Sequence, residues 1–188
     1  MRRLVARLLF WPTLAWNVLW GRVFALRPWW SRVDDRVILG ALPFASDVAR
    51  LREEGVTAVV NICGEHPGPV RAYEEAGIVQ LRLLTPDFSA PSLEDMQRGV
   101  AFIQRHVGEG RTVYVHCKAG RGRSATLVLC WLVACKGVSP EEAYAMLVRK
   151  RAHVVRRFAL RPVIWEFWVR EGVGGGGAGQ GGGAEGGD

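Results

Sequence analysis

The sequence predicts an α/β fold with a central, mostly parallel sheet and helices on both of its faces. Short β-branched runs alternate with helical stretches over most of the chain, which is the pattern of a layered α/β domain. Two of these runs, at 57–62 and 112–115, are apolar enough to be central strands. The second run leads through a small-residue loop into an apolar helical stretch that begins at Ser124. We therefore expect the fold to be built around residues 112–134.

The elements follow in order from strand patterns and capping signals. Strands are expected at 36–39, 57–62, 79–84 and 112–115. Helices are expected at 47–54, 70–76 and 93–107, then from Ser124, from Pro140, and around Trp165, Phe167 and Trp168. Ser46 is the expected cap of the first helix, which Gly55 ends, while Ser92 and Ser139 are the expected caps of two later ones.

The loop at 117–122 has the features of an anion site. Lys118, Ala119, Gly120, Arg121 and Gly122 form a tight turn of mostly small residues directly before a helix. Inward-pointing amides and a helix N-terminus together bind anions, so these five residues are candidates for binding a phosphoryl group.

The loop and its neighbours carry the side chains that transfer of a phosphoryl group needs, namely Cys117, Arg123 and Ser124. A cysteine at the mouth of such a loop has a lowered pKa, which makes Cys117 a thiolate nucleophile. The planar guanidinium of Arg123 can bind two phosphate oxygen atoms at once. In-line attack on phosphorus then gives a phosphocysteine, and a hydrogen bond from Ser124 helps the sulfur to leave. His116 is expected to order the loop rather than to act as a base.

A proton donor is expected from an upstream loop. Asp87 follows the strand at 79–84, thirty residues before Cys117, and Pro86 stiffens its approach. Such an acid can protonate the leaving alkoxide. Asp95 is the alternative, but its capping-box spacing from Ser92 favours a role at a helix terminus.

Composition limits the environment of the protein. The net charge of +7 and the pI near 9.8 favour anionic partners such as a phospholipid surface, nucleic acid or a phosphorylated substrate. The four cysteines show no paired framework and no zinc-type spacing, so a reducing compartment is expected, with no metal and no cofactor.

Residues 1–32 are expected to form an N-terminal helix that lies at a membrane interface or directs the chain to an organelle. This segment has no acidic residue, six arginines and five of the eight tryptophans. Its uncharged run at 8–20 is shorter than the ~20 residues that span a bilayer. A helix packed on the domain, with its tryptophans in a groove, is the alternative.

The C-terminal part divides into a basic stretch and a tail. The stretch at 149–161 is either a solvated face or a contact with anionic lipid. Residues 33–171 are expected to form the catalytic domain, and the glycine-rich residues 172–188 a disordered tail.

Residues 116–124, HCKAGRGRS, resemble the Cys-x5-Arg signature of the protein tyrosine phosphatase superfamily. The resemblance implies the cysteine-phosphatase fold, with Cys117 as nucleophile, Arg123 as phosphate clamp and Asp87 as general acid. The cations Lys118 and Arg121 further suit a substrate that carries a second phosphate.

Three stretches, LLFWPTLAWNVLWGRV, RPWWSRVDDRVILGALPF and YVHCKAGRGRSAT, resemble the mitochondrial phosphatidylglycerophosphate phosphatases, especially their plant and algal forms. The resemblance implies hydrolysis of the terminal phosphate of phosphatidylglycerophosphate without a metal, at the inner mitochondrial membrane or, alternatively, at a plastid or other internal membrane. Phosphoinositides and phosphoproteins remain alternative substrates, and a non-catalytic phosphate-binding module is an alternative of another class. The oligomeric state is left open, and no nucleic-acid partner is expected.

Cys63 is a candidate redox partner of Cys117. The sequence Asn61-Ile62-Cys63 resembles the strand end of tensin-homologue lipid phosphatases, in which a cysteine lies near the catalytic one. The resemblance implies that oxidation would produce a reversible disulfide between Cys63 and Cys117.

Overall fold

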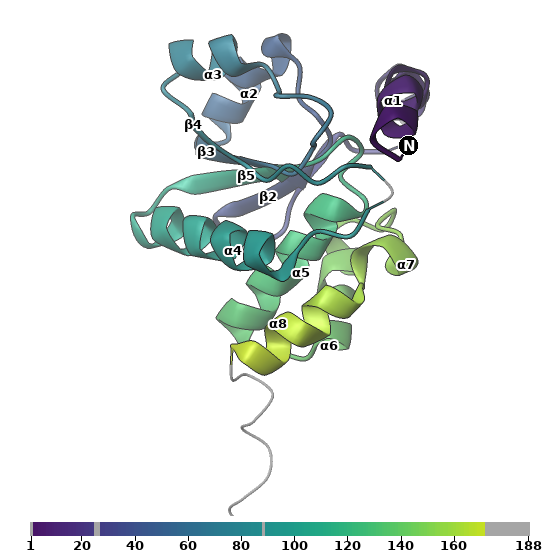
Figure 1. The fold of residues 1–188 in the computed structure, drawn as a ribbon. Coiled ribbons are helices and arrows are strands. Elements are labelled where there is room, and N and C mark those ends of the chain that lie inside the picture. The colour runs from purple at the N-terminus through teal and green to yellow at the C-terminus, as the bar shows by residue number, and fades with distance from the viewer. Residues whose placement is uncertain (1, 25–26, 88, 172–188) are drawn as a thin grey trace, which may run out of the picture.

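A computed structural model describes residues 2–24, 27–87 and 89–171, and the predicted tail at 172–188 lies outside them. The described residues form a five-stranded sheet with helices on both faces, as predicted (Figure 1). The strands are β1 (Trp30–Arg32), β2 (Val37–Gly40), β3 (Val56–Asn61), β4 (Val79–Arg82) and β5 (Thr112–His116). The helices are α1 (Arg2–Val18), α2 (Val48–Glu53), α3 (Val70–Glu75), α4 (Leu93–Gly108), α5 (Arg123–Lys136), α6 (Pro140–Lys150), α7 (Arg156–Ala159) and α8 (Pro162–Arg170).

The sheet order is β1-β2-β5-β3-β4, and every pair except β1 and β2 is parallel. Strand β5 is therefore central, and its carboxyl end lies between those of β2 and β3. Alternate residues of the strands face opposite sides of the sheet. Ile38, Val59 and Tyr114 pack under α2 and α3, whereas Leu39, Val60 and Val115 pack against the layer that contains α4, α5 and α8. Because both faces are covered, the loops at the strand ends hold fixed positions.

Two local predictions about helix starts are confirmed, and one is wrong. The hydroxyl groups of Ser92 and Ser139 accept hydrogen bonds from the amides of Asp95 and Glu142 and cap α4 and α6. Ser46 instead lies inside a short 3-10 turn, Ala45–Asp47, that precedes α2. Asp47 directly precedes α2 but makes no side-chain hydrogen bond that caps it, and its carboxylate instead accepts a hydrogen bond from the amide of Phe44, before the 3-10 turn, at 2.7 Å.

The N-terminal helix ends earlier than predicted. Helix α1 is followed by a π-helical turn, Leu19–Val23, and Trp30–Arg32 is the antiparallel edge strand β1 rather than part of the helix. No helix among the described residues is long and apolar enough to cross a membrane. Phe10 and Leu14 of α1 are buried against Leu42 and Cys63, so this helix packs on the domain.

Arg151 is the exception in the basic stretch at 149–161, because it is buried, whereas Arg149, Lys150, Arg156 and Arg157 are exposed. Its side chain donates hydrogen bonds to the carbonyl of Gly120 at 3.0 Å, to the carbonyl of Pro28 and the hydroxyl of Ser31 at 3.1 Å, and to the carbonyl of Trp29 at 3.3 Å. Burial lowers the pKa of Arg151 to about 10. This arginine therefore joins the end of α6 to the loop at 117–122 and to the segment that enters β1.

Candidate active site

Residues 117–124, which are the loop between β5 and α5 and the first two residues of α5, form the floor of the site. Gly120 has a φ of +65°, and a Cβ atom there would lie 2.4 Å from the carbonyl oxygen of Gly40. A Cβ atom on Gly40 would in turn lie 2.0 Å from the hydroxyl of Tyr114, which donates to the carbonyl of Ala41 at 2.6 Å. The two glycines thus allow the loop to pack directly on the end of β2. The amide of Leu42 donates to the carbonyl of Lys118 at 3.2 Å and holds the loop from the same side.

Cys117 lies at the base of a pocket with its side chain 4% exposed. Burial alone would raise the pKa of this thiol, but the positive charge of Arg123 and hydrogen bonds from Ser124 and from the amide of Ala119 lower it below its ordinary value. The hydroxyl of Ser124 donates to Sγ at 3.1 Å. These contacts favour the thiolate that in-line attack requires.

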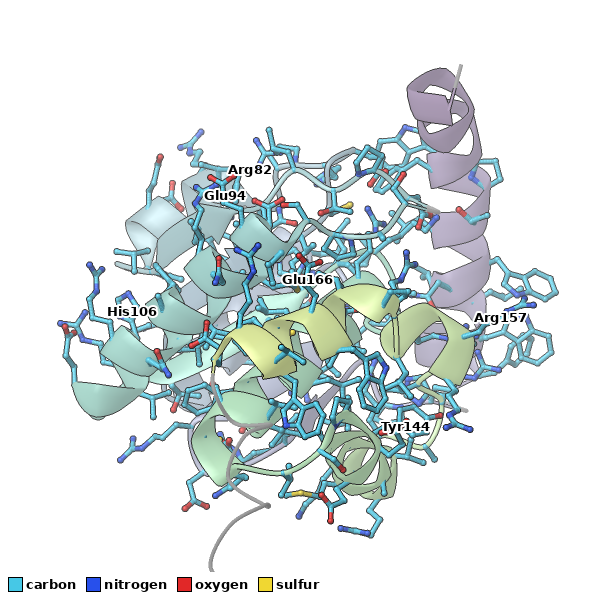
Figure 2. The ribbon with its side chains drawn as sticks, turned by 60° about the horizontal axis from the view of Figure 1, so that its bottom comes forward. Arg82, Glu94, His106, Tyr144, Arg157 and Glu166 are labelled. Carbon is cyan, nitrogen blue, oxygen red and sulfur yellow. The ribbon has the colours of Figure 1, made fainter. Side chains whose placement is uncertain are left out.

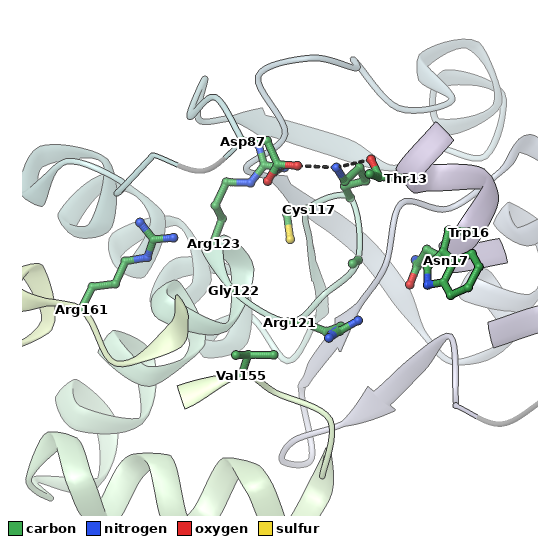
Figure 3. Close-up of a pocket in the computed structure, with 12 residues that line it drawn as sticks. Thr13, Trp16, Asn17, Asp87, Cys117, Arg121, Gly122, Arg123, Val155 and Arg161 are labelled. Atoms are coloured by element: carbon green, nitrogen blue, oxygen red, sulfur yellow. Dashed lines mark hydrogen bonds and ion pairs between the residues drawn. The ribbon is translucent and has the colours of Figure 1, made fainter. Parts of the chain in front are cut away.

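Arg123, at the first turn of α5, is 3% exposed and points toward the same pocket (Figure 3). Its Nη1 lies 2.9 Å from Oε2 of Glu65 and 2.6 Å from the carbonyl oxygen of Thr85, and its Nη2 lies 3.2 Å from Oδ1 of Asp87. Burial would lower the pKa of Arg123, yet the neighbouring thiols and carboxylates raise it well above its ordinary value. The guanidinium is therefore held charged and fixed on two sides.

Asp87 lies above the loop, on the segment that follows β4 (Figure 3). Its carboxylate contacts both Arg123 and Lys118, and Lys118 Nζ also donates to the hydroxyl of Thr13 on α1 at 2.7 Å. The structure thus brings the predicted acid to the same pocket as Cys117. Asp95, the alternative, lies on α4 and pairs with Arg98.

Glu65 is a site residue that was not predicted from the sequence. Its carboxylate forms an ion pair with Arg123 and also accepts a hydrogen bond from the backbone amide of Asp87. It therefore links the arginine that binds phosphate to the loop that carries the predicted acid. Burial would raise the pKa of Glu65, but the charge of Arg123 and hydrogen bonds from its neighbours lower it. The available signal was the position of 63–69 at the carboxyl end of a central strand, which is where open α/β sheets place their sites.

His116 and Cys63 are buried beside the floor. Burial lowers the pKa of His116 to about 3, so its ring is neutral, and Nδ1 lies 3.3 Å from the carbonyl oxygen of Cys117. This placement agrees with an ordering role. The thiol of Cys63 donates to Oε2 of Glu65 at 3.0 Å, and burial raises its pKa to about 12.

The pocket above Cys117 has a volume of about 260 Å³. Thr13, Trp16 and Asn17 of α1 line one side, and Val155 and Arg161 line another (Figure 3). Ala119, Gly122, Arg121 and Lys118 of the loop also line it, so the cations predicted near the scissile phosphate both reach the pocket. The described residues contain no group of three or more His, Cys, Asp or Glu side chains placed to hold a metal ion.

The arrangement can therefore bind a phosphoryl group and attack it. Cys117, whose pKa is lowered, lines the same cavity as the guanidinium of Arg123 and the carboxylate of Asp87. The strand, loop and helix that carry Cys117 and Arg123 are continuous in sequence, whereas Glu65, Asp87 and Thr13 arrive from three other segments.

Comparison with known proteins places this geometry in a family. The family described as dual specificity phosphatase, catalytic domain, matches residues 37–168. The chain is similar to phosphatidylglycerophosphate phosphatase PTPMT1 of Arabidopsis thaliana, with 40% identity over 166 residues that cover 87% of this chain and 49% of the relative. The chain thus spans about half the length of that plant protein.

Two further relatives cover most of their own length. Phosphatidylglycerophosphatase and protein-tyrosine phosphatase 1 of Rattus norvegicus is 40% identical over 172 residues, which cover 87% of this chain and 89% of the relative. The crystal structure of PTPMT1 in complex with PI(5)P matches with a TM-score of 0.72 and 35% identity, over 79% of this chain and 99% of that one.

Proposed function

The chain belongs to the dual specificity phosphatase family and is a cysteine-dependent phosphatase, and on this premise we propose that it hydrolyses the terminal phosphate monoester of phosphatidylglycerophosphate to give phosphatidylglycerol. The observation that carries the proposal is the convergence of Cys117, Arg123 and Asp87 on one pocket with additional cations on its rim. Relatives that are phosphatidylglycerophosphate phosphatases support the choice of substrate.

The proposed reaction has two steps. The thiolate of Cys117 attacks phosphorus, the bond to the glycerol oxygen breaks, and Asp87 gives its proton to that oxygen. Water then attacks the phosphocysteine, gives a proton to Asp87 and releases inorganic phosphate, while Ser124 stabilises the departing thiolate. Arg123 and the amides of the loop bind the three equatorial oxygen atoms throughout. A phosphoryl group bound at Arg123 competes with Asp87 for the guanidinium and so turns this carboxyl group toward the leaving oxygen.

A phosphoinositide phosphatase is the second candidate. The relative crystallised with PI(5)P supports it, and an inositol ring with more than one phosphate also suits a cationic pocket. Phosphoproteins form the third substrate class, which the name of the rat relative, phosphatidylglycerophosphatase and protein-tyrosine phosphatase 1, supports.

We further propose that α1 holds the enzyme at the surface of the inner mitochondrial membrane. Trp11 and Trp16 are 64% and 62% exposed, and Leu19 and Phe24 are exposed beyond them. Side-chain rings project from α1 away from the rest of the molecule (Figure 2). Tryptophan at this density suits the interfacial region of a bilayer. The same helix also lines the pocket.

We also propose that Cys63 protects Cys117 from irreversible oxidation. Hydrogen peroxide would oxidise the Cys117 thiolate to a sulfenic acid with release of hydroxide. The thiol of Cys63 would attack that sulfur, and its proton would pass to the departing hydroxide, so that the disulfide and water form. Peptide mapping after mild peroxide should find Cys63 joined to Cys117, and recovery of Cys117 only as sulfinic or sulfonic acid would contradict the pairing.

A phosphate-release assay tests the substrate. The full chain is compared on vesicles that contain phosphatidylglycerophosphate, phosphatidylinositol 5-phosphate or neither lipid, and on phosphotyrosine and phosphothreonine peptides. We expect the highest kcat/KM on phosphatidylglycerophosphate. A higher value on the phosphoinositide or on either peptide would replace the proposal with that candidate. Flotation of the same chain with cardiolipin vesicles tests the membrane contact, and recovery at the bottom of the gradient would contradict it.

A further inference from the structure

Helix α1 forms part of the wall of the pocket. The buried side chains of Phe10 and Leu14 fasten this helix to Leu42 and Cys63, and the hydroxyl of Thr13 accepts a hydrogen bond from Lys118 in the floor. Trp16 and Asn17, one turn further along α1, therefore stand at the edge of the pocket (Figure 3). A segment for which no catalytic or substrate-binding role was predicted thus contributes side chains to the site.

Two buried hydrogen-bond donors on this side of the pocket have no acceptor among the described residues. The Nδ2 atom of Asn17 and the Nε atom of Arg121 have no hydrogen-bond partner within the described ranges, although both residues line the pocket. A buried donor left without an acceptor costs roughly 1–3 kcal/mol, so such groups usually mark the place of a ligand or an ordered water. Figure 3 shows the two side chains on the same side of Cys117, opposite Arg161.

The charge on this side favours an anion. The positive charge of Arg27 acts together with burial to lower the pKa of Arg121, so the two guanidinium groups are close enough to repel each other. Asp87 is the one acid among the described residues that line the pocket, and it pairs with Lys118 and Arg123. A second negative group beside Arg121 would relieve the repulsion between the arginines.

We propose that Asn17 of α1 and Arg121 of the floor form a second oxyanion subsite, which binds the phosphodiester oxygen atoms of the lipid head group while the monoester lies above Cys117. This inference rests on the proposed function and assigns part of the substrate specificity to the N-terminal helix. The pocket volume of about 260 Å³ is more than the four heavy atoms of one phosphoryl group occupy, which leaves room for the glycerol and the second phosphate. Trp16 then covers the side of the pocket from which the acyl chains leave.

Soluble substrates test the subsite without the influence of membrane binding. The full chain and its Asn17→Leu and Asn17→Asp variants are assayed on deacylated phosphatidylglycerophosphate, which carries both phosphates, and on glycerol 3-phosphate, which carries only the monoester. We expect Asn17→Leu to reduce kcat/KM for the first compound roughly tenfold more than for the second, mainly through KM, because a hydrogen bond to a charged group is lost. Asn17→Asp should reduce it further, since a carboxylate repels the diester.

Ala15→Ser is the control, because Ala15 is exposed on α1 and does not line the pocket. It should leave the ratio between the two substrates unchanged. If the wild-type chain prefers the compound with two phosphates and both Asn17 variants keep that preference, the subsite is wrong and the proposed function stands. If the wild-type chain shows no preference, the subsite is contradicted, whereas the proposed function is decided separately by the assay on vesicles.

Discussion

The floor and the walls of the pocket are built in different ways. The floor at 117–124 is one continuous stretch, shaped by glycine contacts with β2 and by the helix that follows it. The walls come from separate segments, since Glu65, Asp87, Thr13 and Arg161 lie far apart in sequence and meet through side-chain contacts. The difference separates two tasks: the floor provides the nucleophile and the phosphate site, and the walls orient the clamp, hold the acid and select the leaving group. Loss of the nucleophile in the floor should therefore abolish the reaction, whereas changes in the walls, or in the hydroxyl group that supports Cys117, should lower its rate without abolishing it.

The largest effect is expected in the floor, from Cys117→Ser. Turnover should fall on the order of 10⁴-fold or more, because the hydroxyl is not ionised and the covalent intermediate cannot form. Binding of tungstate, a phosphate analogue, should persist, because Arg123 and the loop amides remain. Steady-state release and calorimetric titration measure the two properties. Cys135→Ser, at an exposed cysteine, is the control and should keep full activity. Substantial residual turnover in Cys117→Ser would place the nucleophile elsewhere.

The Asp87→Asn variant should lose activity to an extent that depends on the leaving group. With an alkyl phosphate we expect a loss of roughly 10²–10⁴-fold in kcat, since the alkoxide then leaves without a proton. With an aryl phosphate that has a good leaving group the loss should be much smaller. Parallel kcat measurements on the two esters give the comparison. Asp95→Asn provides the matched control on α4 and should affect neither ester. An equal loss on both esters would exclude Asp87 as the acid.

The Glu65→Gln variant should lower the rate because Arg123 is then held less firmly. Loss of this carboxylate removes one of the contacts that fix Arg123 and loosens the loop of Asp87, and a small displacement of such groups can cost ~10²-fold in rate. We expect kcat/KM to fall by about this factor on alkyl and aryl phosphates alike, together with weaker tungstate binding. Glu109→Gln, which removes a half-exposed carboxylate paired with Arg111, is the control. Unchanged kinetics in Glu65→Gln would mean that the contact with Thr85 alone orients Arg123.

The contrast between floor and walls also decides what the sequence could predict. The α/β class, the mostly parallel sheet with helices on both faces, and the whole of 116–124 follow from local patterns, because apolar runs, glycines and a helix start lie next to one another in the chain. The strand order and the edge strand β1 were not predicted. Asp87 was found because it closely follows a strand whose carboxyl end faces the site. The two capping serines, Ser92 and Ser139, were found for the same local reason.

Residues that act through distant contacts could not be predicted in this way. Glu65 has no local pattern that distinguishes it from a surface carboxylate, and its role depends on an arginine 58 positions away. Arg151 sits in a basic stretch that suggests solvent or lipid contact, yet tertiary packing surrounds it with the carbonyl groups of Gly120, Pro28 and Trp29. Asn17 reaches the pocket only because α1 folds back onto the domain. In each case the decisive partner comes from another element.

The smallest effect is expected from Ser124→Ala, and it should depend on pH. The folded protein lowers the pKa of Cys117, so the thiolate is present above that pKa and is lost as the pH falls through it. Removing the hydroxyl takes away one hydrogen bond to the thiolate, which raises the pKa and moves the acidic limb of kcat/KM to higher pH. On that limb the variant should be roughly tenfold slower, since a hydrogen bond to a charged group contributes ~1.5 kcal/mol, whereas far above both pKa values the effect on kcat/KM should disappear.

A pH profile of kcat/KM on an aryl phosphate measures the shift, and rapid-quench detection of phosphocysteine measures the second step. Because Ser124 also stabilises the departing thiolate in the proposed reaction, the variant should accumulate phosphoenzyme at neutral pH. Ser139→Ala, which removes a capping hydroxyl from α6, should lower thermal stability without moving the acidic limb. A uniform loss at every pH in Ser124→Ala would show that this hydroxyl supports the geometry of the floor and not the charge of Cys117.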